Sequence, residues 1–143
     1  MVTWILKNLG FCDMHEQFPE DASIVSCLGM KDGYNDPEVI YEKVKYILQL
    51  LGRSRKVVVF CHAGLSRSPS MCITALAYQM KTDFMDTYFF VKDDIAPQVN
   101  PSPGLEKCCQ EALELLHRRL THKCECGAPI DKEEGRCKHC LTK

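Results

Sequence analysis

The chain has 143 residues, of which 45% are hydrophobic and 26% charged, and a formal net charge of -1. This length allows one compact domain with a small appendage, and this composition argues against a disordered or fibrous protein. The near-zero charge makes a large nucleic-acid interface unexpected, because such an interface needs clustered Lys and Arg.

Two short strands are predicted in the N-terminal part, at Val2–Leu6 and Ser23–Leu28. The start MVTWILKNLGF is not a secretion signal, and no apolar stretch reaches membrane-spanning length. We therefore expect a monomeric intracellular protein, cytoplasmic or nuclear, without a membrane partner. A helix should follow, because Asp36 can cap its N-terminus, Pro37 suits its first turn and Gly52 can end it.

The middle of the chain predicts a strand, a tight loop and a helix without spacer residues. Val57–Phe60 is a β-branched run typical of a strand buried on both faces, and Ser66–Met80 reads as a largely apolar helix. Further helices are predicted at Thr82–Val91 and from Pro103 to Leu120, on either side of a Pro-rich loop. Strands alternating with helices predict an α/β fold.

The loop between the Val57–Phe60 strand and the next helix carries the pattern Cys-X5-Arg, with Cys61, Arg67 and then Ser68. A loop that curls around an anion can direct successive backbone N–H groups at phosphate oxygens, and Gly64 permits the turn. Arg67 can hold two oxygens in a bidentate fork, while the same N–H groups favour a nucleophilic Cys61 thiolate. Ser68 can stabilise the thiolate as a leaving group. The alternative is that Cys61 is one more buried cysteine.

The segment CHAGLSRSPS, with MKTDFMDTYFFVKDDIAPQVNPSPGLEKC downstream, resembles the dual-specificity branch of the protein tyrosine phosphatases over residues 24–120. The resemblance implies a phosphotyrosine-phosphatase-like α/β fold in residues 1–120, with a reduced central sheet flanked by helices. It also implies hydrolysis of phosphorylated protein substrates through a phosphocysteine on Cys61, with no catalytic cofactor. The residues expected to bind the phosphate are His62, Ala63, Gly64, Leu65, Ser66 and Arg67.

The resemblance also implies a general acid, an Asp in a loop upstream of the Val57–Phe60 strand. Asp32 and Asp36 are the two candidates. Asp36 has an ordinary alternative role as helix N-cap, so we favour Asp32 as the acid. The ordinary alternative for Asp32 is a turn residue beside Gly33.

Three departures from the family pattern have consequences for the site. Phe60 stands where relatives usually have His before the nucleophile, and His62 follows it instead. The region before Asp32 is short, so we expect that a strand and its recognition loop are lost, which leaves a shallow pocket open to phosphoserine and phosphothreonine as well as phosphotyrosine. The residues 92–94, Lys-Asp-Asp, predict a weaker preference for acidic, doubly phosphorylated peptides.

The C-terminal residues 121–143 form a separate cysteine-rich module in this interpretation. Two cysteine pairs, ten residues apart and joined by turn-forming residues, have the arrangement that a structural tetrahedral zinc site needs. His122 or His139 could replace one thiolate, and the alternative is a disordered reduced tail. With four protein ligands the metal has no open position, so the module should stabilise the protein or dock a protein partner. The predicted ligands are Cys124, Cys126, Cys137 and Cys140.

Two other functions remain open at the level of sequence. The first is a non-catalytic adaptor that binds phosphorylated proteins, and the second is an RNA 5′-triphosphatase, for which the charge gives no support. The remaining cysteines are expected to be core residues, with redox protection of Cys61 by one of them as a less favoured role. They are Cys12, Cys27, Cys72, Cys108 and Cys109.

Overall fold

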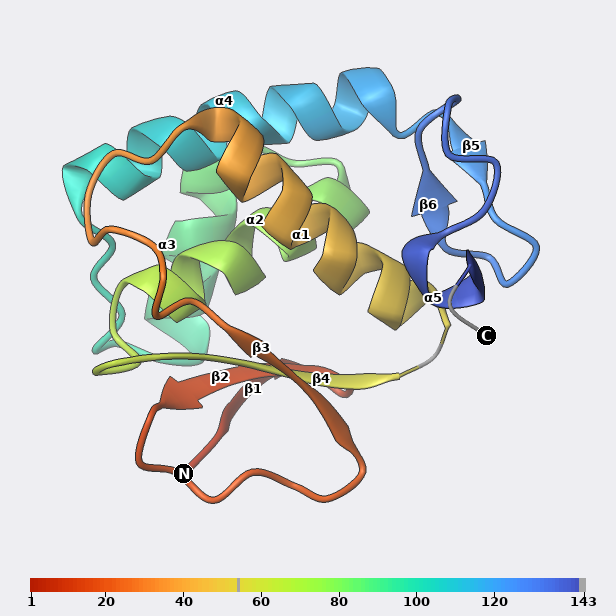
Figure 1. The fold of residues 1–143 in the computed structure, drawn as a ribbon. Coiled ribbons are helices and arrows are strands. Elements are labelled where there is room, and N and C mark those ends of the chain that lie inside the picture. The colour runs from red at the N-terminus through yellow and green to blue at the C-terminus, as the bar shows by residue number, and fades with distance from the viewer. Residues whose placement is uncertain (54, 142–143) are drawn as a thin grey trace.

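The computed structural model describes residues 1–53 and 55–141, and for residues 138–139 it describes the backbone alone. A four-stranded sheet lies against a layer of helices (Figure 1). The cysteine-rich tail sits at the far end of that helical layer, on the side where the chain ends. None of the helices in the described ranges is long and apolar enough to cross a membrane.

The sheet has the strand order β1-β2-β4-β3. Strands β2 and β3 run parallel to β4, while β1 is antiparallel to β2. The carboxyl ends of β2, β3 and β4 therefore meet at one edge of the sheet, the usual place for a ligand site in an α/β fold. The bounds are Thr3–Leu6 for β1, Leu9–Asp13 for β2, Ala22–Ser26 for β3 and Lys56–Cys61 for β4.

Strand β2 was not predicted from the sequence, whereas β1, β3 and β4 were. Its five residues include Gly10, a poor strand former, and they lie only two residues beyond β1. Gly10 is needed there, because a Cβ on it would lie 2.8 Å from the Thr3 carbonyl oxygen of the neighbouring strand. The close approach of β1 to β2 therefore requires Gly10, and Gly10 is the residue that made β2 hard to recognise from the sequence.

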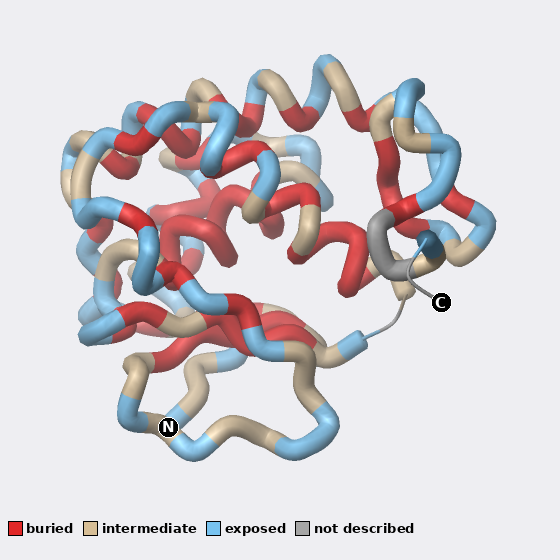
Figure 2. Tube along the Cα trace, viewed as in Figure 1, coloured by how far each residue is buried: buried red, intermediate tan, exposed pale blue. Residues whose placement is uncertain are grey.

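The four long helices confirm the predicted elements to within a few residues. Asp36, Asp83 and Ser102 each accept a hydrogen bond from a backbone N–H in the first turn of the helix that they precede. These caps fix where the helices start, and most of the buried residues lie on the inner faces of the helices and in the sheet (Figure 2). The bounds are Pro37–Gly52 for α1, Arg67–Met80 for α2, Phe84–Asp94 for α3 and Pro103–Arg119 for α4.

The tail packs on the C-terminal half of α1. Gln49 is 1% exposed and its Nε2 donates to the Pro129 carbonyl at 3.1 Å. A Cβ on Gly52 would lie 2.6 Å from the Ala128 Cα, so the two backbones approach as closely as a glycine allows. The tail consists of β5 (His122–Lys123), β6 (Pro129–Ile130) and α5 (Lys138–Leu141).

Candidate active site and metal centre

Cys61 ends β4, and α2 begins at Arg67, so the intervening loop faces the carboxyl edge of the sheet. The Cys61 side chain is 2% exposed. The Gly64 N–H donates to its Sγ at 3.3 Å, and the Ser68 hydroxyl lies 3.2 Å from the same sulfur. Two hydrogen-bonding groups, one from the loop and one from the first turn of α2, therefore lie against one sulfur atom.

The curvature of the loop depends on Gly64. Its φ is +70°, which is the left-handed region, and a Cβ there would lie 2.8 Å from the Cys12 carbonyl carbon. The loop is fixed from outside as well, because the Asn100 N–H donates to the Leu65 carbonyl at 2.8 Å. His62 and Ala63 are exposed, and the His62 carbonyl accepts from the Met14 N–H at 3.4 Å.

Arg67 is held by the loop that carries the candidate acid. Its Nη1 donates to the Met30 carbonyl at 3.0 Å, and its side chain is half-buried. A guanidinium has five N–H donors in a planar fork, so this single contact orients the fork and leaves donors for an anion. The contact joins the Cys61 loop to the 30–35 segment, which is the arrangement that the sequence hypothesis requires.

The two aspartates occupy different positions. Ser66 donates from its hydroxyl to the Asp32 Oδ1 at 2.7 Å, so Asp32 lies against the loop of Cys61. Asp36 instead accepts from the Glu38 N–H at 3.0 Å and caps α1. The structure therefore brings Asp32 to the candidate site and gives Asp36 the capping role expected from its sequence context.

Three supporting residues were not identified from the sequence. Asn35, which is 8% exposed, accepts from the Lys31 N–H at 3.0 Å and donates to the Gly33 carbonyl at 3.0 Å, which fixes the turn that presents Asp32. The Cys12 carbonyl accepts from the Ser68 hydroxyl at 3.4 Å. A Cβ on Gly104 would lie 2.4 Å from the Tyr34 N, so α4 approaches this turn closely. The Cys12 and Gly104 contacts join segments distant in sequence, and no sequence motif marks them; the Asn35 contacts are local to the turn.

Phe60, the unusual residue before the nucleophile, has a packing role. Its half-buried ring lies 5.2 Å from the Phe18 ring, centroid to centroid, at an interplanar angle of 45°. Aromatic pairs at this separation stabilise a structure beyond their burial alone. The Phe60 position thus anchors the segment between β2 and β3 instead of donating a hydrogen bond to the loop.

Two other cysteines near the site stay protonated at neutral pH. Burial raises the pKa of Cys12 to about 11 and that of Cys27 to about 12. Both side chains are at most 4% exposed, as expected for core cysteines. The structure therefore gives these two thiols no nucleophilic role.

The tail brings together the Sγ atoms of Cys124, Cys126, Cys137 and Cys140, which all lie within 4.8 Å of one another. The Cys124 and Cys140 sulfurs are 3.5 Å apart, and those of Cys126 and Cys137 are 3.6 Å apart. Zn–S bonds of about 2.3 Å in a tetrahedron place sulfurs slightly under 4 Å apart, so the four cysteines fit a metal of this kind. All four cysteines are free thiols and none of them forms a disulfide with another described residue.

The two histidines considered as alternative ligands have different outcomes. The His122 Nδ1 lies 2.9 Å from the Thr121 hydroxyl, and His122 is not part of the cysteine group. The side chain of His139 lies outside the described residues. Near the sulfurs, the Arg53 Nη1 lies 3.1 Å from the Cys140 Sγ, so a cation from the end of α1 faces the group.

No protein-family model and no curated protein matches the chain. Solved structures do match its fold. A leucine-rich-repeat and phosphatase-domain protein from Entamoeba histolytica superposes with a TM-score of 0.66 at 15% identity, over 82% of this chain and 93% of that one. The human tyrosine phosphatase-like serine/threonine/tyrosine-interacting protein gives 0.68 at 16% identity, over 81% and 97%.

The Cydia pomonella PTP-2 phosphatase gives a TM-score of 0.59 at 17% identity, over 77% of this chain and 88% of the phosphatase. These matches span nearly the whole length of the other proteins, so the likeness is to a complete domain. The predicted phosphatase-like α/β architecture is confirmed at the level of the backbone. The chain has the fold of the protein tyrosine phosphatases.

Proposed function

We propose that the chain is a protein phosphatase that hydrolyses phosphotyrosine and phosphoserine or phosphothreonine through a phosphocysteine on Cys61. This proposal rests on the environment of the Cys61 sulfur. The Gly64 N–H donates to this sulfur at 3.3 Å, and the Ser68 hydroxyl lies 3.2 Å from it. The fold shared with phosphatases supports it.

The reaction has two steps. In the first, the Cys61 thiolate attacks phosphorus, the bond from phosphorus to the leaving oxygen breaks, and Asp32 gives its proton to that oxygen. Arg67 and the loop N–H groups hold the phosphoryl oxygens as their charge redistributes. In the second step water attacks the phosphocysteine and gives a proton to the Asp32 carboxylate, the P–S bond breaks, and the Ser68 hydroxyl stabilises the departing thiolate. Inorganic phosphate leaves.

The same proposal covers the range of substrates. His62, Ala63 and Leu65 are exposed, and Leu65 is 42% exposed at the rim of the loop. A shallow loop lets the short phosphoserine and phosphothreonine side chains reach Cys61 as well as the longer phosphotyrosine. The partner is then a phosphorylated protein, and no catalytic metal is required.

We further propose that the tail binds one structural zinc ion. The four convergent sulfurs fit tetrahedral coordination, and Arg53 would offset part of the negative charge that four thiolates bring. The ion would hold β5, β6 and α5 together, since a segment of this size has little core of its own. The tail would then be a stable second module of the protein.

A non-catalytic adaptor is the second candidate. The human protein with the same fold is described as phosphatase-like and as an interacting protein. Phe60 favours this candidate too, because its ring packs on Phe18 and supplies no polar group to the loop. In an adaptor the loop would bind phosphorylated peptides without turnover.

Steady-state hydrolysis separates the candidates. The wild type and Cys61→Ser are assayed with p-nitrophenyl phosphate, with phosphotyrosine and phosphothreonine peptides, and with 5′-triphosphate RNA. We expect release of phosphate from the aryl ester and the peptides, and its loss in Cys61→Ser by at least about a thousandfold. Peptide binding without turnover in the wild type would establish the adaptor, and turnover of RNA alone would establish the triphosphatase.

A further inference from the structure

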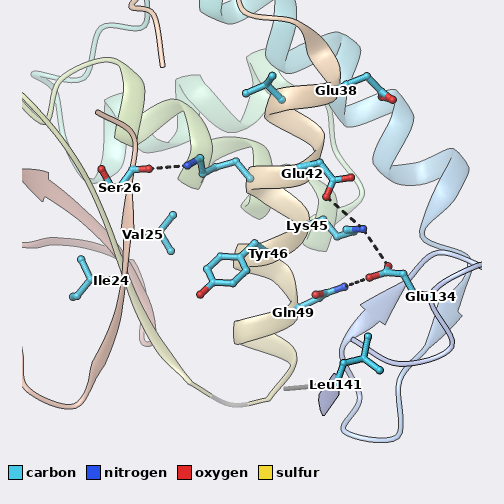
Figure 3. Close-up of a pocket in the computed structure, with 12 residues that line it drawn as sticks. Ile24, Val25, Ser26, Glu38, Glu42, Lys45, Tyr46, Gln49, Glu134 and Leu141 are labelled. Atoms are coloured by element: carbon cyan, nitrogen blue, oxygen red, sulfur yellow. Dashed lines mark hydrogen bonds and ion pairs between the residues drawn. The ribbon is translucent and has the colours of Figure 1, made fainter. Parts of the chain in front are cut away.

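A groove runs between the edge strand β3 and helix α1, and the C-terminal tail closes one end of it (Figure 3). Its volume is about 970 Å³, and no residue of the 61–67 loop lines it. Apolar side chains from three elements border it, and each is substantially exposed: Ile24 on β3 by 37%, Val39 on α1 by 48% and Leu141 in the tail by 64%. The groove is therefore a surface separate from the candidate active site.

The backbone of β3 has one unpaired edge along this groove. Strand β3 is the last in the sheet and pairs with β4 alone. The Cys27 N–H donates to the Phe60 carbonyl at 2.8 Å, so by the alternation of a parallel ladder the peptide groups of Ile24 and Ser26 point away from β4. Among the described residues, no hydrogen bond engages the N–H or the carbonyl of Ile24.

Lys43 occupies the last outward-facing carbonyl of the unpaired edge. Its Nζ donates to the Ser26 carbonyl at 2.8 Å, which is a side-chain substitute for a neighbouring strand. Unpaired strand edges attract another backbone, and proteins protect them with charged side chains of this kind. Here the protection covers one carbonyl and leaves the Ile24 groups open.

We propose that the groove binds an extended segment of a partner protein, which adds a strand to β3. An extended backbone can satisfy the outward N–H and carbonyl groups of Ile24, whereas a helix uses its own backbone groups internally. A second copy of this chain fits less well, because its β3 is flanked by its own α1 and tail. The occupant is therefore a single extended strand lying between β3 and α1.

The charges of the groove specify the partner further. Its amines are engaged, since Lys43 binds the Ser26 carbonyl and the Lys45 Nζ lies 3.3 Å from the Glu134 carboxylate. Its carboxylates are paired as well, with Glu38 bound by Arg119 and Glu42 lying 3.6 Å from the Lys45 Nζ, but the Glu42 side chain stays 67% exposed and can take a second cation. A segment with Lys or Arg at the position facing Glu42 and apolar residues beside Val39 would complement both.

The tail contributes directly to this site. Glu134 and Leu141 line the groove, and Glu134 is held against α1 by Lys45 and by the Gln49 Nε2 at 3.3 Å. Residues from the cysteine-rich module thus complete a binding surface that begins on the sheet. This gives the module a role in partner recognition that does not depend on the catalytic proposal.

The probe for this proposal is a phage-displayed library of random 12-residue peptides, selected on the full zinc-loaded chain. Peptides that are enriched are synthesised and their affinity is measured by fluorescence anisotropy. Ile24→Pro removes the outward N–H without touching the ladder to β4, and Val39→Asp places a charge in the apolar wall. We expect each variant to weaken binding by about tenfold or more.

A matched pair tests the charge. Glu42→Lys and Glu114→Lys are the same change on exposed helix surfaces, the first inside the groove and the second on α4 outside it. We expect Glu42→Lys to weaken the selected peptides several-fold and Glu114→Lys to leave their affinity unchanged. Bound peptide should also slow hydrogen exchange of the Ile24 and Ser26 amides.

Several results would overturn the proposal. They are a library from which no peptide is enriched, peptides that bind Ile24→Pro and Val39→Asp as tightly as the wild type, and peptides displaced by inorganic phosphate, which would place them at the Cys61 loop. A concentration-dependent dimer of the wild type that Ile24→Pro abolishes would also overturn it, because a second copy would then occupy the groove.

Discussion

The loop after β4 and the C-terminal tail both depend on cysteine, but they surround it differently. In the loop one sulfur, Cys61, is approached by an N–H and a hydroxyl. In the tail four sulfurs converge within 4.8 Å of one another. A single sulfur among hydrogen-bond donors is the setting expected of a nucleophile, whereas converging sulfurs are the setting expected of metal ligands. We therefore propose different chemistry for the cysteines of the two regions.

Helix α1 connects the two regions. It starts at the Asp36 cap, close to the turn that presents Asp32, and it ends at Gly52 and Arg53 against the tail. Changes at one end of α1 should therefore affect catalysis, and changes at the other end should affect the stability of the tail. The predictions below separate these two outcomes.

The largest effect is expected at Asp32. Replacing this acid by Asn should lower kcat for phenyl phosphate by about 10²–10⁴-fold, because the poor leaving group then departs without a proton. The loss should be much smaller for p-nitrophenyl phosphate, whose leaving group needs no proton. Asp36→Asn is the matched control, since Asn caps a helix as well as Asp does. Full activity in Asp32→Asn with a crippled Asp36→Asn would reverse the assignment.

If the tail holds the proposed zinc ion, its removal should unfold the tail and leave the Cys61 loop intact. Structural zinc contributes roughly 10–16 kcal/mol of binding free energy in zinc-finger peptides, so chelation or Cys137→Ser should unfold residues 121–141 and lower Tm. Hydrolysis of p-nitrophenyl phosphate should remain within a few-fold of the wild type, because the proposed mechanism uses no metal. Zinc content by elemental analysis and thermal melts check the first part. An unchanged melt after complete zinc removal would contradict it.

A smaller effect is expected at Gly52. Gly52→Ala would place a Cβ 2.6 Å from the Ala128 Cα, so the tail must shift away from α1. We expect the free energy of unfolding to fall by about 1–3 kcal/mol because of this clash. Replacing Gly by Ala in a helix without such a clash normally stabilises the helix. Urea denaturation measures it. A more stable Gly52→Ala would mean that the tail does not pack there.

The smallest effect is expected at Ser66, which links the Asp32 carboxylate to the loop. The hydroxyl donates to Asp32 at 2.7 Å and accepts from the Ser102 N–H at 3.1 Å. Ser66→Ala should cost about 0.5–1.5 kcal/mol, or at most about tenfold in kcat/KM. The double variant with Asp32→Asn should lose little more than Asp32→Asn alone. Fully additive losses would show that Ser66 does not act through Asp32.

The parts of the molecule that the sequence predicts are those encoded locally. The helix starts at Asp36 and Ser102 follow from capping chemistry, and the Cys61–Arg67 loop follows from a short motif. The convergence of the tail cysteines follows from their spacing. Each of these features lies within one short stretch of the chain, at most the 16 positions between Cys124 and Cys140, which is why a single sequence reveals them.

The remaining features depend on contacts between distant segments. Strand β2 is recognisable only from its pairing with β4, and the Met30 carbonyl binds Arg67 across 37 positions of the chain. The β3–α1 groove likewise exists because the tail returns to α1. Tertiary packing determines these contacts, and neither composition nor periodicity carries information about them.

The most direct test of the central claim is to capture the covalent intermediate. Ser68→Ala should slow breakdown of the phosphocysteine, so rapid acid quenching during turnover of p-nitrophenyl phosphate should leave one phosphoryl group on the chain. Peptide mass spectrometry should place it on Cys61, and Cys61→Ser should carry none. Two results would contradict the account: a phosphoryl group on any other residue, or steady turnover by the wild type and by Ser68→Ala with no covalent adduct in either.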